Sequence, residues 1–417
     1  IPPQQFDGGT LRIDVLEGRY GAVQAVSADA ALAASVQSYL APLVPGTVIE
    51  GDALERVTLL LADLPGLQTL PLVRPGTQTG SGDLQVHASR GATQGGYAAL
   101  DNHGNYYSGQ TRARVGAVFT SSLLLGDELS VGGVRAADGL WLASVAYGAP
   151  VGIDGWRVTA SRVRTRYRLT HGFEGNEGTA EVTSAGVSYP MVRSRKGNLT
   201  VSLSWQEKTL FNSRAFGADT ERYKLQGVPV SVQFDVRDSL GGITFGSLVR
   251  TAGRLDKNDA IRQGRFNKYN VDVVHLQPLG EGFSLHARAS GQAASRNLDS
   301  AEGMSLGGAN GVRAYPNGEA AGDEGWLAQV ELRYTAGAFT PYTFYDQGKV
   351  QVNAQPQLVA GAVADKRRAG AGVGVRYLNG AWSLDLALAW RLGGPAPESV
   401  QGQDRAPRAW FSGTYRF

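Results

Sequence analysis

The feature that most restricts how this chain can fold is a strict alternation of apolar and polar residues, repeated from about residue 95 to the end. In the stretches 198–205 (NLTVSLSW), 326–334 (WLAQVELRY) and 382–390 (WSLDLALAW), every second residue is apolar. Successive side chains of a β-strand point to opposite faces, so each stretch predicts a strand with one apolar and one polar face.

Two of these stretches carry aromatic residues at both ends of the apolar face, Trp326 with Tyr334 and Trp382 with Trp390. About nine strand residues tilted by 45° span roughly 20 Å. This length matches the apolar band between the aromatic girdles of an outer-membrane barrel. The alternative is a soluble sandwich or propeller, in which the apolar face would meet a second sheet. Long strands with charged and small residues on the polar face favour a water-filled lumen instead.

The length of the alternating region sets the number of strands. Roughly 320 residues, at about 20 per strand and connection, give about 16 strands, and bacterial barrels have an even number. The chain ends in AWFSGTYRF, where Tyr415 and Phe417 share the apolar face, as in a terminal barrel strand. We therefore expect residues 91–417 to form a transmembrane antiparallel β-barrel of about 16 strands, wide enough for an aqueous channel.

Composition excludes several other classes of protein. The chain of 417 residues has no cysteine, which rules out disulfides and cysteine-based metal sites or nucleophiles. Its formal net charge of +3 is too balanced to indicate nucleic-acid binding. No apolar run approaches the roughly 18 to 20 residues of a membrane-spanning helix.

The front of the chain does not alternate in this way. Residues 10–18 predict a short strand, and two apolar stripes at helical spacing predict helices, the second with Asp52 as its N-cap. Two further strands are expected over 67–76 and 82–91. The order predicts a small α/β domain over residues 10–90, preceded by a linker remnant over 1–9. Because short turns and the N-terminus of a barrel share one side, we expect this domain in the periplasm.

Such a domain has an exposed sheet edge and a groove beside a helix. An extended peptide could add to that edge as a further strand. The alternative is a rigid spacer with no binding role.

Three patterns that resemble catalytic or metal sites fail on their context. The sequence GMSLG (303–307) matches a nucleophile-elbow pattern but leads into a glycine-rich loop, not a helix. The sequence GAGVG (370–374) continues as a strand, unlike a dinucleotide loop. The five histidines have no metal-ligand spacing. We therefore predict no catalytic residue, no metal and no cofactor.

Four arginines alternate along one face of SRVRTRYRL: Arg162, Arg164, Arg166 and Arg168. Each would cost on the order of 2–4 kcal/mol if it faced lipid at mid-depth. They are therefore predicted to face the lumen or to lie beyond the hydrocarbon, and we interpret them as a basic stripe in the lumen. Such a stripe could line the path of a passing or plugging segment, or be a solvated surface without a specific role.

The stretch VRAYPNGEAAGDEGW (312–326) is small, polar and rich in turn residues, and it opens on a lone arginine, Arg313. Downstream, in FYDQG, Phe344 and Asp346 share one strand face and Tyr345 takes the other. A loop over about 305–325 that folds inward could bring Arg313 to Asp346. A guanidinium can hold a carboxylate by two parallel bonds, which lysine cannot do.

These two motifs resemble those of the outer-membrane transporters of two-partner secretion, of the hemolysin-activator and filamentous-hemagglutinin secretion type, within the barrel-assembly superfamily. That family carries a VRGY-type motif in its sixth extracellular loop and an F-x-D-x-G motif on a following strand; this chain departs from it at Ala314, where glycine is usual. The front domain resembles the second polypeptide-transport-associated (POTRA) domain. The resemblance implies a salt bridge between Arg313 and Asp346 that locks the loop. It also implies supporting roles for the loop residues Val312, Tyr315, Pro316, Gly322 and Asp323 and for the strand residues Phe344 and Gly348.

The resemblance implies an outer-membrane pore that recognises an unfolded exoprotein through its N-terminal secretion domain and translocates it to the cell surface. Its expected partners are that exoprotein, the lipid of the outer membrane and, during biogenesis, the barrel-assembly machinery; we expect a monomer and no nucleic acid. Two alternatives remain. An assembly factor for other barrels would reveal itself by loss of envelope barrels on depletion. A diffusion porin would leave the front domain and the paired motifs unexplained.

Overall fold

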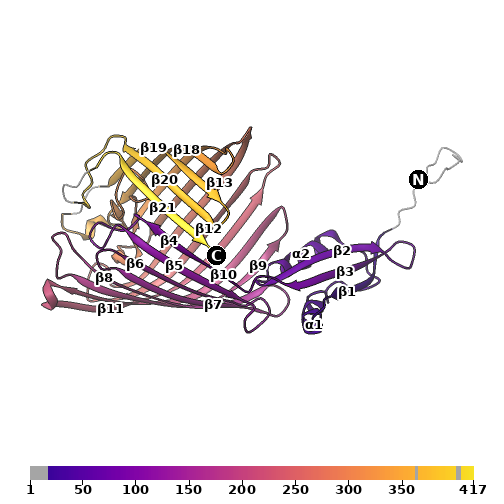
Figure 1. Ribbon diagram of the computed structural model, residues 1–417. Coiled ribbons are helices and arrows are strands. Elements are labelled where there is room, and N and C mark those ends of the chain that lie inside the picture. Colours follow the sequence, from indigo (N-terminus) through magenta and orange to yellow (C-terminus); the bar gives the residue numbers. More distant parts are fainter. Residues whose placement is uncertain (1–16, 362–364, 401–404) are drawn as a thin grey trace, which may run out of the picture. The chain divides into compact units, whose positions relative to one another are not determined.

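The computed structural model describes residues 17–361, 365–400 and 405–417. The chain divides after Gly91 into two compact units, coloured indigo and violet-to-yellow in Figure 1. The strand expected over 10–18 falls almost entirely outside the described residues. The first strand of the structure follows it directly, at β1 (Arg19–Val26).

The first unit is a three-stranded sheet with two helices. Strand β1 runs parallel to β3 (Ser81–Arg90), and β3 pairs in antiparallel fashion with β2 (Leu67–Pro75), giving the order β1-β3-β2. The helices are α1 (Ala30–Tyr39) and α2 (Gly51–Ala62). The prediction of a small α/β domain is confirmed.

The helix starts differ from one of the expectations. Asp29 caps α1, and its Oδ1 accepts from the backbone N–H groups of Ala31 and Leu32 at 3.0 and 3.1 Å. The N-cap of α2 is Glu50, without a side-chain cap bond, so the prediction that Asp52 occupies that position is wrong. Asp52 lies in the first turn instead, where its carboxylate still faces the positive end of the helix dipole.

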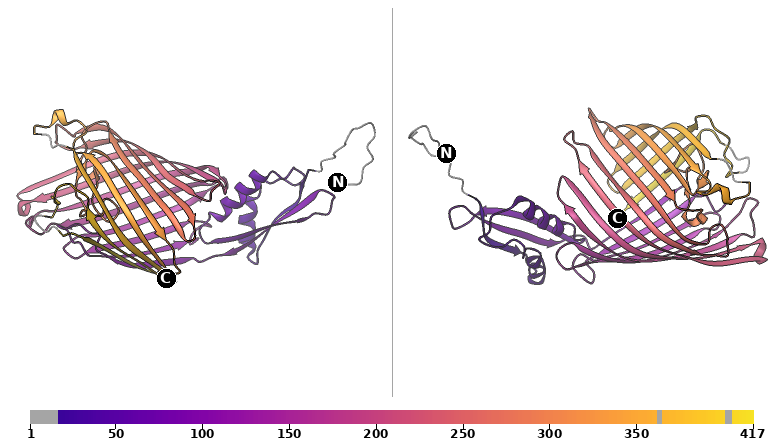
Figure 2. Two further views of the ribbon diagram at one scale, coloured as in Figure 1. Left: turned by 90° about the horizontal axis from the view of Figure 1, so that it is seen from above. Right: turned by 180° about the vertical axis from the view of Figure 1, so that it is seen from behind.

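The second unit is a closed barrel of sixteen antiparallel strands, which confirms the predicted strand number (Figures 1 and 2). The first eight are β4 (Gln94–Asp101), β5 (Arg112–Thr120), β6 (Glu128–Ala136), β7 (Trp141–Val151), β8 (Trp156–Arg168), β9 (Glu177–Arg193), β10 (Gly197–Arg214) and β11 (Asp219–Arg237). The other eight are β12 (Ile243–Asp256), β13 (Gly264–Gly280), β14 (Phe283–Ala294), β17 (Glu324–Tyr334), β18 (Phe339–Gln351), β19 (Lys366–Asn379), β20 (Trp382–Arg391) and β21 (Arg408–Arg416).

The alternation of the sequence becomes the two faces of this wall. On β17, Trp326, Val330 and Tyr334 are exposed on the outside, whereas Gln329 and Glu331 are buried on the inside. Short turns join the strands at one end and longer loops at the other. None of the helices in the described part of the chain is long and apolar enough to cross a membrane.

The barrel closes where β21 pairs with β4, along Ser412–Arg416 and Tyr97–Asp101. The backbone N–H of Phe417 donates to Gly96 O at 3.0 Å, and Gly96 N–H donates to Phe417 O at 2.8 Å. Outside this seam, the Tyr415 ring stands 4.9 Å from that of Trp382 and 6.3 Å from that of Phe417. Tyr415 thus belongs to an aromatic group at the turn end of the wall.

The wall is not equally tall all round. Strands β9, β10 and β11 have 17, 18 and 19 residues, whereas β4 and β21 at the seam have 8 and 9. At about 3.3 Å per residue, the tall side therefore extends well beyond the short side.

Residues 295–323, which we call the inward loop, connect β14 to β17 and fold into the barrel interior. The loop contains the short 3-10 helix Ser300–Glu302 and a two-strand ribbon, β15 (Met304–Ser305) with β16 (Ala321–Gly322). Two other 3-10 turns lie at Ala215–Gly217 and Pro356–Leu358. Apolar loop residues form a buried cluster with side chains of β17, β18, β20 and β21.

Candidate functional site

The tip of the inward loop is bound to β18 by the arginine and aspartate that the sequence singled out. Arg313 Nε donates to Asp346 Oδ2 at 2.8 Å and Arg313 Nη2 donates to Oδ1 at 2.6 Å. The backbone N–H of Arg313 adds a third bond to Oδ2 at 3.0 Å. Arg313 is 5% exposed and Asp346 is 0% exposed. The pair is therefore bidentate and shielded from water, unlike an exposed surface ion pair.

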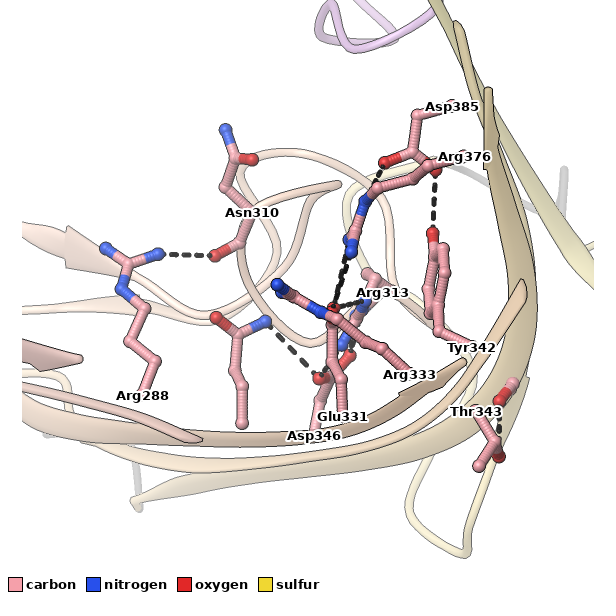
Figure 3. A network of polar contacts seen from close by, with 12 residues as sticks. Arg288, Asn310, Arg313, Glu331, Arg333, Tyr342, Thr343, Asp346, Arg376 and Asp385 are labelled. Atoms are coloured by element: carbon pink, nitrogen blue, oxygen red, sulfur yellow. Dashed lines mark hydrogen bonds and ion pairs between the residues drawn. The ribbon is translucent and has the colours of Figure 1, made fainter. Parts of the chain in front are cut away.

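This pair belongs to a larger group, the tip cluster, drawn in Figure 3. Arg313 Nη1 donates to Glu331 Oε1 at 2.5 Å, and Arg376 and Arg333 also donate to the Glu331 carboxylate. Arg376 Nε reaches Asp385 Oδ2 at 2.9 Å. The tip cluster consists of three arginines and three carboxylates: Arg313, Arg333, Arg376, Glu331, Asp346 and Asp385. Its formal charge is zero, so the buried ions are balanced within the cluster.

Phe344 and Gly348, the other members of the strand motif, shape the seat of the loop. The Arg313 guanidinium carbon lies 3.5 Å from the centre of the Phe344 ring, a cation–π contact. A Cβ on Gly348 would stand 2.7 Å from Leu306 Cδ2 and 2.8 Å from the Trp326 carbonyl oxygen. Leu306 is fully buried. The absence of a side chain at Gly348 thus lets the loop pack directly on the wall.

The rest of the loop motif is also buried. Val312 and Tyr315 are fully buried, and the Tyr315 hydroxyl donates to Gly393 O at 3.3 Å. Pro316 is buried and its carbonyl accepts from the Glu319 N–H at 3.3 Å. At Ala314, where the family usually has glycine, the backbone is outside the left-handed region. Its methyl group packs where a Cβ of Gly370 would stand, so the wall leaves room for it.

Gly322 and Asp323 close the loop where it rejoins the wall. A Cβ on Gly322 would lie 2.4 Å from the carbonyl oxygen of Gln351. The Asp323 N–H donates to that same oxygen at 3.0 Å, and Asp323 Oδ2 accepts from the Ala354 N–H at 3.0 Å. Asp323 therefore ties the end of the inward loop to the start of the next loop.

Sequence reasoning missed a second group of charges, at the start of the loop. Buried Glu302 binds Lys208 of β10 and Lys268 of β13, and Lys257 bridges Asp299 at 3.4 Å and Glu221 at 3.3 Å. This stem cluster has three lysines and three carboxylates: Lys208, Lys257, Lys268, Glu221, Asp299 and Glu302. Burial raises the pKa of Glu302, but the charges of Lys268 and Lys208 outweigh it and hold that pKa below its usual range.

A third contact, also missed, joins the inward loop to residues 392–400. Buried Glu319 accepts from Arg368 at 2.5 Å and from the backbone N–H groups of Glu398 and Ser399, both at 3.0 Å. The signal in the sequence was weak, because Glu319, Arg368 and the donating loop 392–400 are far apart along the chain.

The interpretation of the four alternating arginines as a lumen stripe is wrong. Arg162, Arg164, Arg166 and Arg168 lie on the same face of β8 as Trp156 and Val158, both exposed on the outside of the wall. The opposite face carries Tyr167, whose hydroxyl bonds Asn212 on the lumen side. Arg162 and Arg164 pair with Glu181, and Arg166 and Arg168 with Glu177. The stripe therefore lies on the outer face of the wall, in ion pairs with carboxylates of the neighbouring strand β9.

The patterns rejected as catalytic lie in ordinary structure. The stretch 303–307 runs through β15, and residues 370–374 lie inside β19, with no helix after them. Among the described residues, no three His, Asp or Glu side chains are grouped so that they could hold a metal ion.

The family of this protein follows from its sequence and agrees with this geometry. Residues 80–377, well over half of the chain, match the family described as haemolysin secretion/activation protein ShlB/FhaC/HecB. The chain belongs to that family of outer-membrane transporters. Members of the family secrete a partner exoprotein in two-partner secretion, so the predictions of a transporter, of an outer-membrane location and of a non-enzymatic function are confirmed.

Individual relatives and solved structures agree with this family and with this fold. The heme/hemopexin transporter protein HuxB of Haemophilus influenzae is 26% identical over 415 residues, which cover 93% of this chain and 73% of HuxB. The structure of CdiB from Escherichia coli superposes with a TM-score of 0.79 at 19% identity, over 99% of this chain and 79% of that one. BamA from Haemophilus ducreyi, lacking POTRA domains 1–3, gives a TM-score of 0.62 at 12% identity over 96% and 85%.

Proposed function

We propose that this haemolysin secretion/activation family member translocates its exoprotein through the barrel lumen, and that Arg313 holds the inward loop in the working position. The observation that carries the proposal is the buried, bidentate contact between Arg313 and Asp346 at the centre of the tip cluster. A loop inside the lumen decides what space is left for a passing chain. A lock on that loop therefore acts directly on transport.

The exoprotein is recognised, in this proposal, through its N-terminal secretion domain on the small α/β domain in the periplasm. Strand β2 is an edge of the three-stranded sheet, and it exposes Leu70 and Val73. Residues of β2, β3 and the start of α1 also line a groove of about 650 Å³. Addition of an extended segment to this edge would satisfy its backbone groups and cover the two apolar side chains.

The lock is strong enough to control the position of the loop. If Arg313 is truncated, Asp346 remains buried and loses its cation, whereas Glu331 keeps Arg333 and Arg376. Loss of one partner of a buried ion pair costs about 3–5 kcal/mol, which changes the ratio of docked to released loop by at least about 100-fold. The remaining residues of the motifs, including Val312, Tyr315, Phe344 and Gly348, support the same docked position by packing.

The remaining partners belong to the proposal as well. The transporter acts as a monomer, inserted into outer-membrane lipid by the barrel-assembly machinery, because one closed barrel contains the whole lumen and both halves of the lock.

The test is secretion of the cognate exoprotein by cells that carry wild type or Arg313→Ala at equal levels of folded barrel. We expect Arg313→Ala to reduce secretion at least about tenfold. Arg288→Ala is the matched control, because Arg288 is also a lumen arginine with its own carboxylate, Asp272, at 2.6 Å. Its contact with the inward loop is a long bond from Nη1 to Asn310 O at 3.5 Å (Figure 3), in place of the buried bidentate pair of Arg313. Wild-type secretion by Arg313→Ala would refute the lock, and secretion that does not need the protein at all would refute the transport function.

A further inference from the structure

The outward arginine stripe of β8 begins unusually low on the wall. Only three outward residues, Trp156, Val158 and Ala160, precede Arg162 on this strand. Six residues at about 3.3 Å each, tilted by about 45°, put Arg162 roughly 14 Å above Trp156. The apolar band of a barrel is about 25 Å tall. Arg162 and Arg164 therefore lie at a depth where lipid chains would normally surround the wall.

The stripe is not neutralised by the protein. Two carboxylates, Glu177 and Glu181, serve four guanidinium groups, whose side chains remain 43 to 64% exposed. The same outward face continues with exposed cations on the neighbouring tall strands: Arg222, Lys224, Arg250, Arg254 and Arg265. The acids on this part of the face are Glu177, Glu181, Glu207 and Asp256. Nine cations against four carboxylates leave a net charge of +5 on this outward face of strands β8 to β13.

We propose that this face binds the phosphate groups of anionic outer-leaflet lipids and draws them toward the turn end, so that the bilayer is locally thinned beside β8 and β9. An arginine fork matches the geometry of a phosphate group. A lipid headgroup at the level of Arg162 takes the place of the acyl chains there. The charged side chain then avoids the free-energy cost of facing hydrocarbon. The strands that carry the charges are the tall ones, so the phosphates at the upper arginines remain at the ordinary headgroup level.

An acidic segment of a secreted protein is the competing occupant for such a surface. The depth of Arg162 and Arg164 favours lipid, because a protein segment would have to displace acyl chains to reach them. The flanking outward residue on β7, Val145, is itself 44% exposed and apolar, as expected for lipid contact at this level.

The first test measures lipid binding by the whole chain. Purified wild type would be incubated with mixed micelles of phosphatidylcholine and lipid A, and the lipid A that it retains would be counted by native mass spectrometry. Replacing all four arginines of the stripe by glutamine should lower the apparent affinity for lipid A at least about tenfold, since each basic residue near an anionic surface contributes to attraction. Inorganic phosphate alone at the same concentration should not displace the lipid.

The matched control changes the charge in the opposite direction at the same place. The double variant Glu177→Gln, Glu181→Gln leaves the stripe intact without its counter-charges, and it should retain more lipid A than wild type. Equal retention of lipid A by wild type and the four-glutamine variant, or no preference of wild type for lipid A over phosphatidylcholine, would overturn the proposal.

The second test measures the thinning and does not depend on the four-glutamine variant folding. The chain has no cysteine, so Ala160→Cys provides a single site for a spin label between Val158 and Arg162. In lipid bilayers with lipid A, we expect this label to be more accessible to a water-soluble nickel reagent than a label at Leu386→Cys, in the apolar row between Trp382 and Trp390. Equal protection of the two labels would contradict the thinning.

Discussion

At the tip of the inward loop the cations are arginines, and at its stem they are lysines. Each cluster holds three cations and three carboxylates, and each joins the loop to separate strands of the wall. At the tip, the guanidinium of Arg313 fixes both the distance and the plane of the Asp346 carboxylate. At the stem, the ammonium groups around Glu302 are point charges without a preferred plane. The difference indicates that the tip specifies one loop conformation, whereas the stem restrains the loop with more freedom.

The largest expected effect comes from changing the type of cation in each cluster, lysine for arginine at the tip and arginine for lysine at the stem. Arg313→Lys should lose nearly as much secretion as Arg313→Ala, at least about tenfold, because lysine cannot form two parallel bonds to Asp346 while also reaching Glu331. Lys208→Arg should stay within about twofold of wild type, since the stem needs a charge and not a fork. Secretion of the cognate exoprotein at equal barrel levels measures both. Full activity of Arg313→Lys would show that the tip also needs only a charge.

A smaller effect is expected when the stem alone is released. Glu302→Gln leaves the ammonium groups of Lys208 and Lys268 without their shared carboxylate, at a cost of about 1–3 kcal/mol. Hydrogen exchange should become faster over 298–306 and stay slow around Arg313. Glu207→Gln is the control, because Glu207 lies next to Lys208 on β10 but pairs with Lys224 on the outer face. Equal loss of protection at the tip would mean that the two clusters are one cooperative unit.

The smallest effect concerns pH. The pKa of Glu302 is lowered in the folded protein, so its contribution to loop docking is fully present above its usual pKa and is lost only as pH falls through the lowered value. We therefore expect the stem to stay docked from neutral pH to about pH 4.5 and to loosen only in stronger acid. A spin label at Ser305→Cys would report this as increased mobility. Loosening between pH 5 and 7 would contradict the assignment.

The two clusters also differ in how far the sequence could predict them. The tip cluster could be predicted because Arg313 lies in a short motif. In addition, Phe344 and Asp346 share a strand face that the alternation of the sequence defines. The stem cluster could not be predicted, since Lys208, Lys268 and Glu302 come from three segments that meet only through the register of the closed barrel. Glu319 and Arg368 were missed for the same reason.

The periodicity of the sequence predicted the barrel and the front domain. It did not predict which face of β8 points to the outside of the wall. The polar face of a membrane strand normally points inward, and that rule placed the arginine stripe in the lumen. The sequence held a contrary signal, because Trp156 and Val158 occupy the same alternating positions as Arg162. The rule fails on β8, where guanidinium groups paired with carboxylates of β9 occupy the outward positions after Ala160. The missing information was which residues of β9 stand beside the stripe, which depends on strand register and not on local pattern.

The seam of the barrel joins β21 to β4, and the hydrogen bond between Phe411 and Asn102 beside it links residues 309 positions apart. No smaller piece of the barrel contains both sides of this seam. Every intermediate with fewer strands therefore presents two unpaired edges to its surroundings. Pairing of the first and last strands is consequently the last step of barrel assembly, and the closed lumen exists only after that step.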